Sequence, residues 1–70
     1  MSDLDARLIA AHETGDAAEL VALYSEAADA AADEVGQAFY LTHAYVFALE
    51  AGMSEAAELH ARLKAMGREE

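Results

Sequence analysis

A short motif occurs twice in this chain. A glycine, a brief turn and the string Ala-Ala-Glu-Leu appear in residues 15–20 and again in residues 52–59. The two glycines are 37 residues apart, and the two Ala-Ala-Glu-Leu strings are 39 residues apart. A period near that length is typical of paired-helix repeats. The repetition therefore predicts two stacked helical hairpins.

The composition indicates an all-α fold in a single domain of residues 1–70. Alanine, the best helix former, is the commonest residue, and proline is absent. The predicted architecture is four helices in two stacked antiparallel hairpins, with hairpin one at about 3–32, a linker at 33–36 and hairpin two at about 37–67. The four glycines are placed at helix edges or in the linker.

Capping patterns predict the helix boundaries. The first helix spans about 3–13, with Ser2 as its N-cap, and ends before Gly15. Asp16 followed by Glu19 is a capping-box pattern that opens the second helix. The third helix runs from 34 or 35 to 51, and Ser54 caps the fourth, which stops at Gly67 before a frayed tail. The predicted buried stripes are Leu4, Leu8, Ala11, then Leu20, Leu23, Tyr24, Ala27, Ala28, Ala31, then Ala56, Leu59, Leu63, Met66.

The third predicted helix is apolar on nearly all sides, and it carries four of the five aromatic residues. A helix of this kind is usually buried on all sides, which two neighbouring helices in a 70-residue chain can hardly achieve. We therefore expect part of its surface to meet a partner, most simply a second copy in a homodimer. Tyr40 and Phe47 are the predicted self-association residues.

The charge balance limits the kinds of partner. Fourteen acidic residues stand against four basic ones, for a net charge of −10. This excess argues against nucleic acids and anionic membrane surfaces, and it fits a basic partner or simply solubility. The longest apolar stretch is too short to cross a bilayer, and cysteine is absent. The N-terminus lacks a signal-peptide pattern, so we expect a cytoplasmic protein.

The layout of helix, glycine turn, helix, linker and repeat resembles tetratricopeptide-type repeats. Residues at or near signature positions are Leu4, Leu8, Ala11, Gly15, Tyr24, Ala27, Gly52 and Ala57, whereas Arg7, Tyr45 and Ala61 depart from the pattern and no closing proline exists. In that family the first helix of each pair lines a concave face that holds a partner peptide. The resemblance implies a face formed by Asp5, Ile9, His12, Glu13, Phe39, Thr42, Val46 and Glu50. The alternative is that Phe39 and Val46 simply belong to the core.

The three histidines of the chain are the candidate metal ligands. No acidic residue lies three or four positions from His43 or His60, and a glycine turn separates His12 from Asp16. We expect His43 to be a buried histidine with a satisfied hydrogen bond, and His12 and His60 to be solvated. No nucleophile–base pattern or phosphate loop occurs, so neither catalysis nor a cofactor is predicted.

Three functional hypotheses follow. The first is a small, acidic, self-associating interaction module without catalytic activity. The second is a structural or regulatory subunit of a larger complex. The third is a metal-binding helical bundle, with a site assembled across helices.

Overall fold

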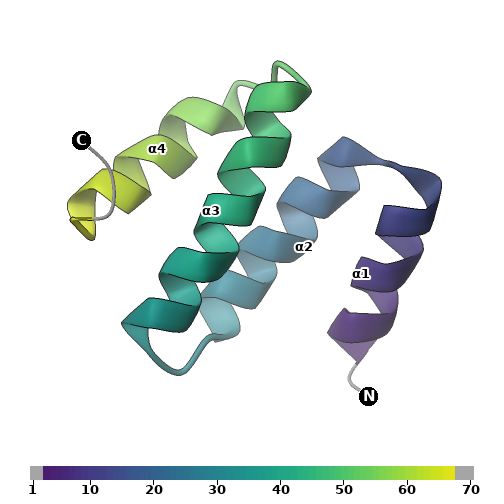
Figure 1. Cartoon of the computed structure of the whole chain (residues 1–70), viewed down its shortest axis with the longest axis horizontal. Helices are drawn as coiled ribbons and strands as arrows, with labels where there is room; N and C mark the ends of the chain where they lie inside the picture. The colour runs from purple at the N-terminus through teal and green to yellow at the C-terminus, as the bar shows by residue number, and fades with distance from the viewer. Residues whose placement is uncertain (1–2, 68–70) are drawn as a thin grey trace.

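The fold is all-α, as the sequence predicts. The computed structural model describes residues 3–67, which form α1 (Asp3–Thr14), α2 (Ala17–Ala30), α3 (Glu34–Glu50) and α4 (Glu55–Ala65) (Figure 1). No strand occurs in that range. The predicted cap at Ser2 and the predicted tail after Gly67 lie outside the described residues.

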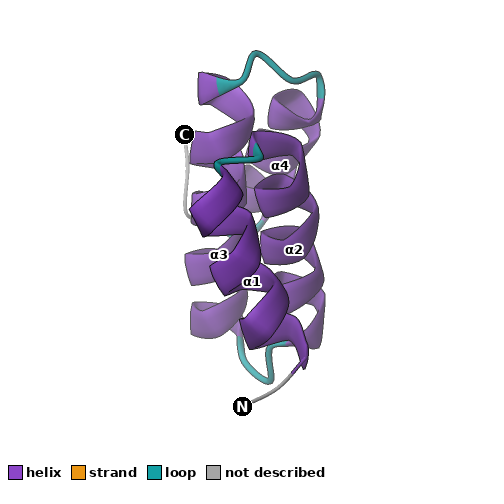
Figure 2. Cartoon of the chain, turned by 90° about the vertical axis from the view of Figure 1, so that its right-hand side faces the viewer, coloured by secondary structure: helices purple, strands orange, loops and turns teal. Residues whose placement is uncertain are grey.

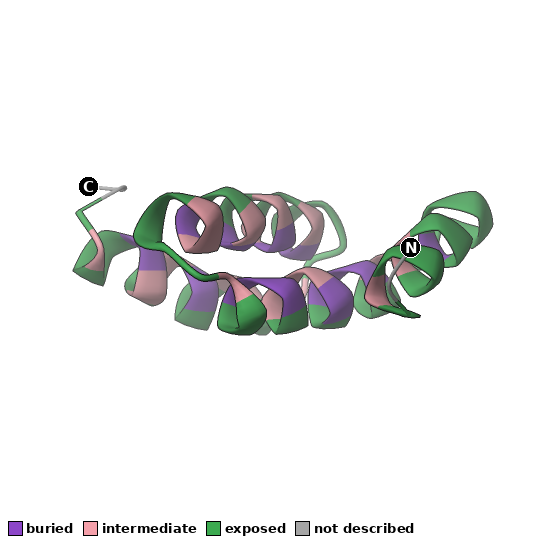
Figure 3. Ribbon diagram, turned by 90° about the horizontal axis from the view of Figure 1, so that it is seen from below, coloured by how far each residue is buried: buried purple, intermediate pink, exposed green. Residues whose placement is uncertain are grey.

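The helices form a flat molecule with a core on one side of α3. The Cα trace measures 32 × 29 × 11 Å along its principal axes. α3 packs most extensively on α2 and also on α4, whereas α1 packs on the far side of α2 (Figures 1 and 2). Seen from below, α3 lies above the other helices and turns its buried side toward them (Figure 3). Its opposite side is therefore left uncovered.

Side-chain caps at aspartate start α2 and α3. Asp16 accepts a hydrogen bond from the Glu19 amide at 3.2 Å, as the capping box predicts. Asp33 accepts one from the Gly36 amide at 2.7 Å and has extended backbone angles. Because Asp33 is the cap, α3 begins at Glu34, the earlier of the two predicted starts, so the helix begins inside the span of 33–36 that was assigned to the linker. Gly36 lies in the first turn of the helix.

The turn between α3 and α4 is set by Gly52. Its φ of +66° is a conformation that glycine adopts without strain. The Met53 amide donates to the Ala48 carbonyl at 2.9 Å, and the Gly52 amide donates to the Leu49 carbonyl at 3.1 Å, which together form a Schellman motif. Ser54 occupies the N-cap position of α4 but makes no capping bond, and its hydroxyl donates to Glu55 Oε1 instead. The predicted serine cap is therefore absent.

The core has two parts that share two aromatic residues. One part joins α2, α3 and α4 through Val21, Ala28, Leu41, Ala44, Ala48, Leu59 and Leu63. The other joins α1 to α2 through Ala11, Leu20 and Leu23. Tyr24 and Phe47 are partly buried and pack against both parts. The predicted stripes of α2 and α4 are confirmed at their leucines, and Val21 adds to the predicted set.

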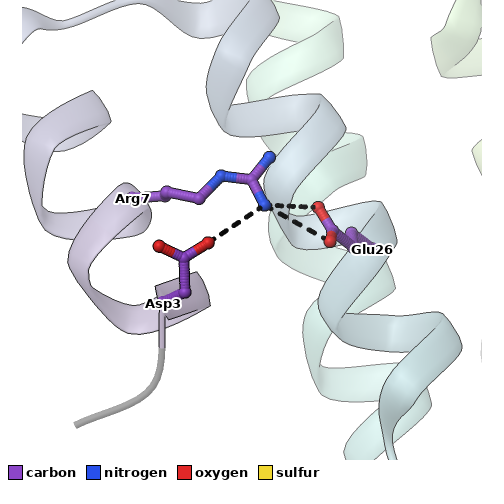
Figure 4. Close-up of polar contacts among 3 residues, drawn as sticks. All are labelled: Asp3, Arg7 and Glu26. Atoms are coloured by element: carbon purple, nitrogen blue, oxygen red, sulfur yellow. Dashed lines mark hydrogen bonds and ion pairs between the residues drawn. The ribbon is translucent and has the colours of Figure 1, made fainter.

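Two ion pairs connect the outer helices to α2. Arg7 of α1 lies 3.3 Å from Glu26 Oε2 and 4.0 Å from Asp3 Oδ2 (Figure 4). Arg62 of α4 donates to Asp29 Oδ1 at 3.0 Å, although the spacing of Glu58 and Arg62 favours a pair within α4. Both pairs are exposed, so each contributes at most about 1 kcal/mol.

Candidate interaction surface

All eight residues of the predicted partner face are exposed. Phe39 and Val46 are 58% and 44% exposed, so the alternative that they belong to the core is wrong. On α1, Ile9 is 49% exposed, and its neighbours on the face are exposed as well. The complete exposed set is Asp5, Ile9, His12, Glu13, Phe39, Thr42, Val46 and Glu50. The structure thus leaves this surface open, whether or not a partner uses it.

The uncovered side of α3 carries a regular row of side chains. Its members alternate in spacing between four and three residues, and all are exposed: Val35, Phe39, Thr42, Val46 and Leu49. We call this row the α3 stripe. It lies opposite the buried residues Leu41, Ala44 and Ala48. Val35 and Leu49 do not belong to the predicted face, although the alternating spacing of four and three residues was a signal for both.

The predicted self-association residues lie elsewhere on α3. Tyr40 and Phe47 are both half-buried and pack against the core. The Tyr40 ring lies 6.3 Å from the Tyr24 ring, and the Phe47 ring lies 5.7 Å from it. These two aromatic residues therefore face α2 more than solvent, and the exposed apolar area of α3 belongs to the stripe.

An aromatic cluster joins the stripe to α1. Tyr24 of α2 stacks on His43 at 5.2 Å and on Phe47 at 5.7 Å, measured between ring centroids. His12 of α1 meets Tyr24 and Phe47 edge-on, each at 5.8 Å. Its Nε2 atom lies 2.8 Å from the Tyr24 hydroxyl, so the two groups share a hydrogen bond. We call these four residues the Tyr24 cluster.

The histidines have structural contacts in this surface. His43 is half-buried, and its Nδ1–H donates to the Phe39 carbonyl at 2.8 Å, because a carbonyl oxygen can only accept. His12 is exposed, as expected, but its hydrogen bond to Tyr24 gives it an ordered position. His60 of α4 is half-buried and stacks on Tyr45 at 5.4 Å, where full solvation was expected.

Shallow pockets open on the surface of residues 3–67. One has a volume of about 210 Å³ and is lined by Thr42, His43, Val46 and Phe47, so it lies between the α3 stripe and the Tyr24 cluster. Another has a volume of about 240 Å³ between α2 and α4, and it contains none of the predicted face residues. The first pocket is therefore bordered by two residues of the predicted face, Thr42 and Val46.

The predicted face carries negative charge only. Its charged side chains are the carboxylates of Asp5, Glu13 and Glu50. The two arginines in the described range are paired with carboxylates of α1 and α2. α1 and α3 run in the same direction, so Glu13 and Glu50 are at the same end of the molecule, where both helix dipoles are also negative (Figure 1).

The described residues show no arrangement for metal chemistry. Within residues 3–67 there is no group of three or more histidine, cysteine, aspartate or glutamate side chains that could hold a metal ion. Over the same range no buried polar side chain lacks a hydrogen-bond partner. None of the four helices is long and apolar enough to cross a membrane. The chain matches no family model, no curated protein and no solved structure.

Proposed function

We propose that this chain is a non-catalytic protein–protein interaction module that binds a basic segment of a partner protein through the exposed faces of α1 and α3. The observation that carries the proposal is the α3 stripe beside three carboxylates. Phe39, Val46 and Leu49 form a row of apolar side chains that the rest of residues 3–67 leaves exposed. Contiguous apolar surface of this kind marks interaction sites in soluble proteins.

The acidic groups supply selectivity and speed. Asp5, Glu13 and Glu50 flank the apolar surface on a chain with a net charge of −10. Such a field attracts basic partners and repels acidic ones, and it raises association rates more than affinity. The resemblance to tetratricopeptide-type repeats supports the same assignment, because there the first helix of each pair, here α1 and α3, holds the partner peptide.

The test is affinity capture from the source lysate with a matched pair of variants. Val46→Glu adds a charge to the α3 stripe, and Ala57→Glu adds the same charge at an exposed site on α4. We expect a protein that co-purifies with the parent and with Ala57→Glu, and that is lost with Val46→Glu. Loss of the same protein at moderate salt indicates an electrostatic contribution. A set of captured proteins that Val46→Glu leaves unchanged contradicts the proposal.

The result also separates a transient module from a permanent subunit. A stripe-dependent partner that remains bound through high salt and long washes indicates a structural subunit of a larger complex, because large apolar interfaces are insensitive to salt. A partner released by moderate salt indicates a transient interaction module.

Self-association through the α3 stripe is the second candidate. A row with alternating spacings of four and three is the pattern that lets one helix pack along another, and a second α3 has that pattern. Sedimentation equilibrium at low and moderate salt tests this candidate. A dimer that strengthens with salt and that Val46→Glu dissociates supports it, and a monomer throughout excludes it.

A further inference from the structure

We infer that the partner segment is a basic amphipathic α-helix that packs lengthwise along the α3 stripe, in heptad register. This inference rests on the proposed function and specifies the conformation and chemistry of its partner. It depends on three features of the described residues: the spacing of the stripe, the state of its polar groups and the charges on its flanks.

The spacing of the stripe matches a helix and not an extended peptide. Residues 35, 39, 42, 46 and 49 occupy the a and d positions of a heptad repeat. Side chains at this period of 3.5 residues stay in line with a second helix that crosses at about 20°. The stripe covers about 21 Å along the helix axis, at 1.5 Å per residue. A partner helix of about two heptads is long enough to cover it.

The α3 stripe offers few hydrogen bonds to an extended backbone. Thr42 Oγ1 donates to the Ala38 carbonyl at 2.7 Å, and His43 Nδ1–H donates to the Phe39 carbonyl at 2.8 Å. Both side chains are therefore engaged with the backbone of α3, whose own amides and carbonyls are paired within the helix. An extended peptide against this apolar row would leave its inward-facing backbone groups without protein partners, which costs free energy. A helix satisfies its backbone internally and presents only side chains.

The pocket beside the stripe provides a place for an anchor residue. Its four lining residues, Thr42, His43, Val46 and Phe47, surround about 210 Å³ of open volume. The pocket lies on the flank of the stripe, so we expect it to receive a leucine or similar side chain from the flank of the partner helix. His43 and Phe47 stack on Tyr24, which holds this wall of the pocket in place.

The flanking charges select a basic helix over a second copy of this chain. Glu50 follows the last stripe residue, and Glu13 of α1 lies at the same end of the molecule (Figure 1). A second copy of this chain carries the same net charge of −10 and the same two carboxylates, so its approach to this surface opposes like charges, which is unfavourable. Lysine or arginine on the flank of the partner helix places opposite charges there.

The test uses three synthetic peptides of about 21 residues, or three heptads. The first has leucine at a and d and lysine at e and g, so its own charges oppose self-association. The second replaces every lysine with glutamate. The third has the composition of the first plus two central prolines, which prevent a continuous helix. Binding to the full chain is measured by fluorescence anisotropy, and the site is mapped by amide chemical-shift changes.

We expect the lysine helix to bind, with shifts concentrated at Phe39, Thr42 and Val46. Val46→Glu should weaken binding at least about tenfold, as for a central interface residue. Ala57→Glu should leave it unchanged, and circular dichroism confirms that both variants are folded. If the proline peptide binds as tightly as the lysine helix, the inference that the partner segment is helical is overturned. If the glutamate peptide binds as tightly as the lysine helix, the inference that the partner is basic is overturned.

The remaining outcomes are also decisive. Binding that Val46→Glu leaves unchanged places the peptide away from the stripe and overturns the inference. Failure of all three peptides overturns the inference, and a dimer that Val46→Glu dissociates then assigns the stripe to a second copy. If the lysine helix binds at the stripe but lysate capture yields no stripe-dependent partner, the stripe accepts a basic helix as inferred and the proposed role in binding a partner protein fails. If capture yields a stripe-dependent partner whose binding segment is extended, the proposed function stands and the inference of a helix is overturned.

Discussion

Replacing Leu63 with alanine should remove most of the stability of this domain. Leu63 is 0% exposed and lies in the core part shared by α2, α3 and α4, beside Leu41 and Leu59. A leucine-to-alanine change at such a site costs about 3–5 kcal/mol, because the cavity collapses only partly. A domain of 70 residues has a total unfolding free energy of about 4–10 kcal/mol. The expected loss is therefore comparable to the total unfolding free energy of the domain.

The assay is urea unfolding followed by circular dichroism at 222 nm. With a slope near 1 kcal/mol per molar urea, typical of small proteins, the midpoint should fall by about 3–5 M, or the folded baseline should disappear. The control is Leu49→Ala, which removes the same atoms from a side chain that is 54% exposed on the α3 stripe. Its effect should stay within about 0.5 kcal/mol.

Two results would refute this reasoning. A loss under about 1 kcal/mol for Leu63→Ala would mean that Leu63 is not enclosed by three helices. A loss for Leu49→Ala as large as that for Leu63→Ala, growing with protein concentration, would mean that the stripe is already covered by a second copy in solution.

Three further predictions concern single groups, each measured by the same urea titration. Tyr24→Phe keeps the ring stack but removes the hydroxyl that bonds His12, so it should cost about 0.5–1.5 kcal/mol. Asp33→Ala removes the α3 cap and should lower the unfolding free energy by about 1 kcal/mol. Ser54→Ala changes a cap position without a capping bond, so it should alter the unfolding free energy by less than about 0.5 kcal/mol. Equal effects of the two changes would contradict the cap assignment. Gly52→Ala forces a φ of +66° on a residue with a Cβ and should cost about 1–2 kcal/mol, and no loss would mean that the turn relaxes to another conformation.

The parts of the fold that depend on local pattern were predictable from the sequence. Leu20, Leu23, Leu59 and Leu63 follow helical spacing, and each is buried. The cap at Asp16 was equally visible. Val21 was missed because it faces α4, from the other hairpin, and the spacing within α2 contains no information about that neighbour.

Contacts between residues far apart in the sequence determine which side chains of α3 are exposed in the candidate site. α3 is apolar on nearly all sides, so its sequence alone cannot say that Phe47 packs inward while Phe39 lies outside. That choice depends on where α1 and α2 dock, because the Phe47 ring meets Tyr24 of α2 and His12 of α1. The pairing of Arg62 with Asp29 in place of Glu58 has the same origin, since the two residues are 33 positions apart in the chain.

The thin attachment of α1 has a consequence for binding kinetics. α1 buries a single residue, Ala11, and packs only on α2 apart from the ring of His12. Helices with so few buried contacts open locally at a lower free energy than the global one, so amides of α1 should exchange with solvent faster than those of α2 and α3.

Half of the predicted face, Asp5, Ile9, His12 and Glu13, departs with α1 in each opening event. A ligand that contacts both α1 and α3 can bind only the molecules in which α1 is docked. Its apparent dissociation constant therefore equals the intrinsic one divided by the fraction of such molecules. Binding of such a ligand should in turn slow amide exchange in α1. The exchange rate of α1 therefore reports how much of the surface centred on α3 is occupied by ligand.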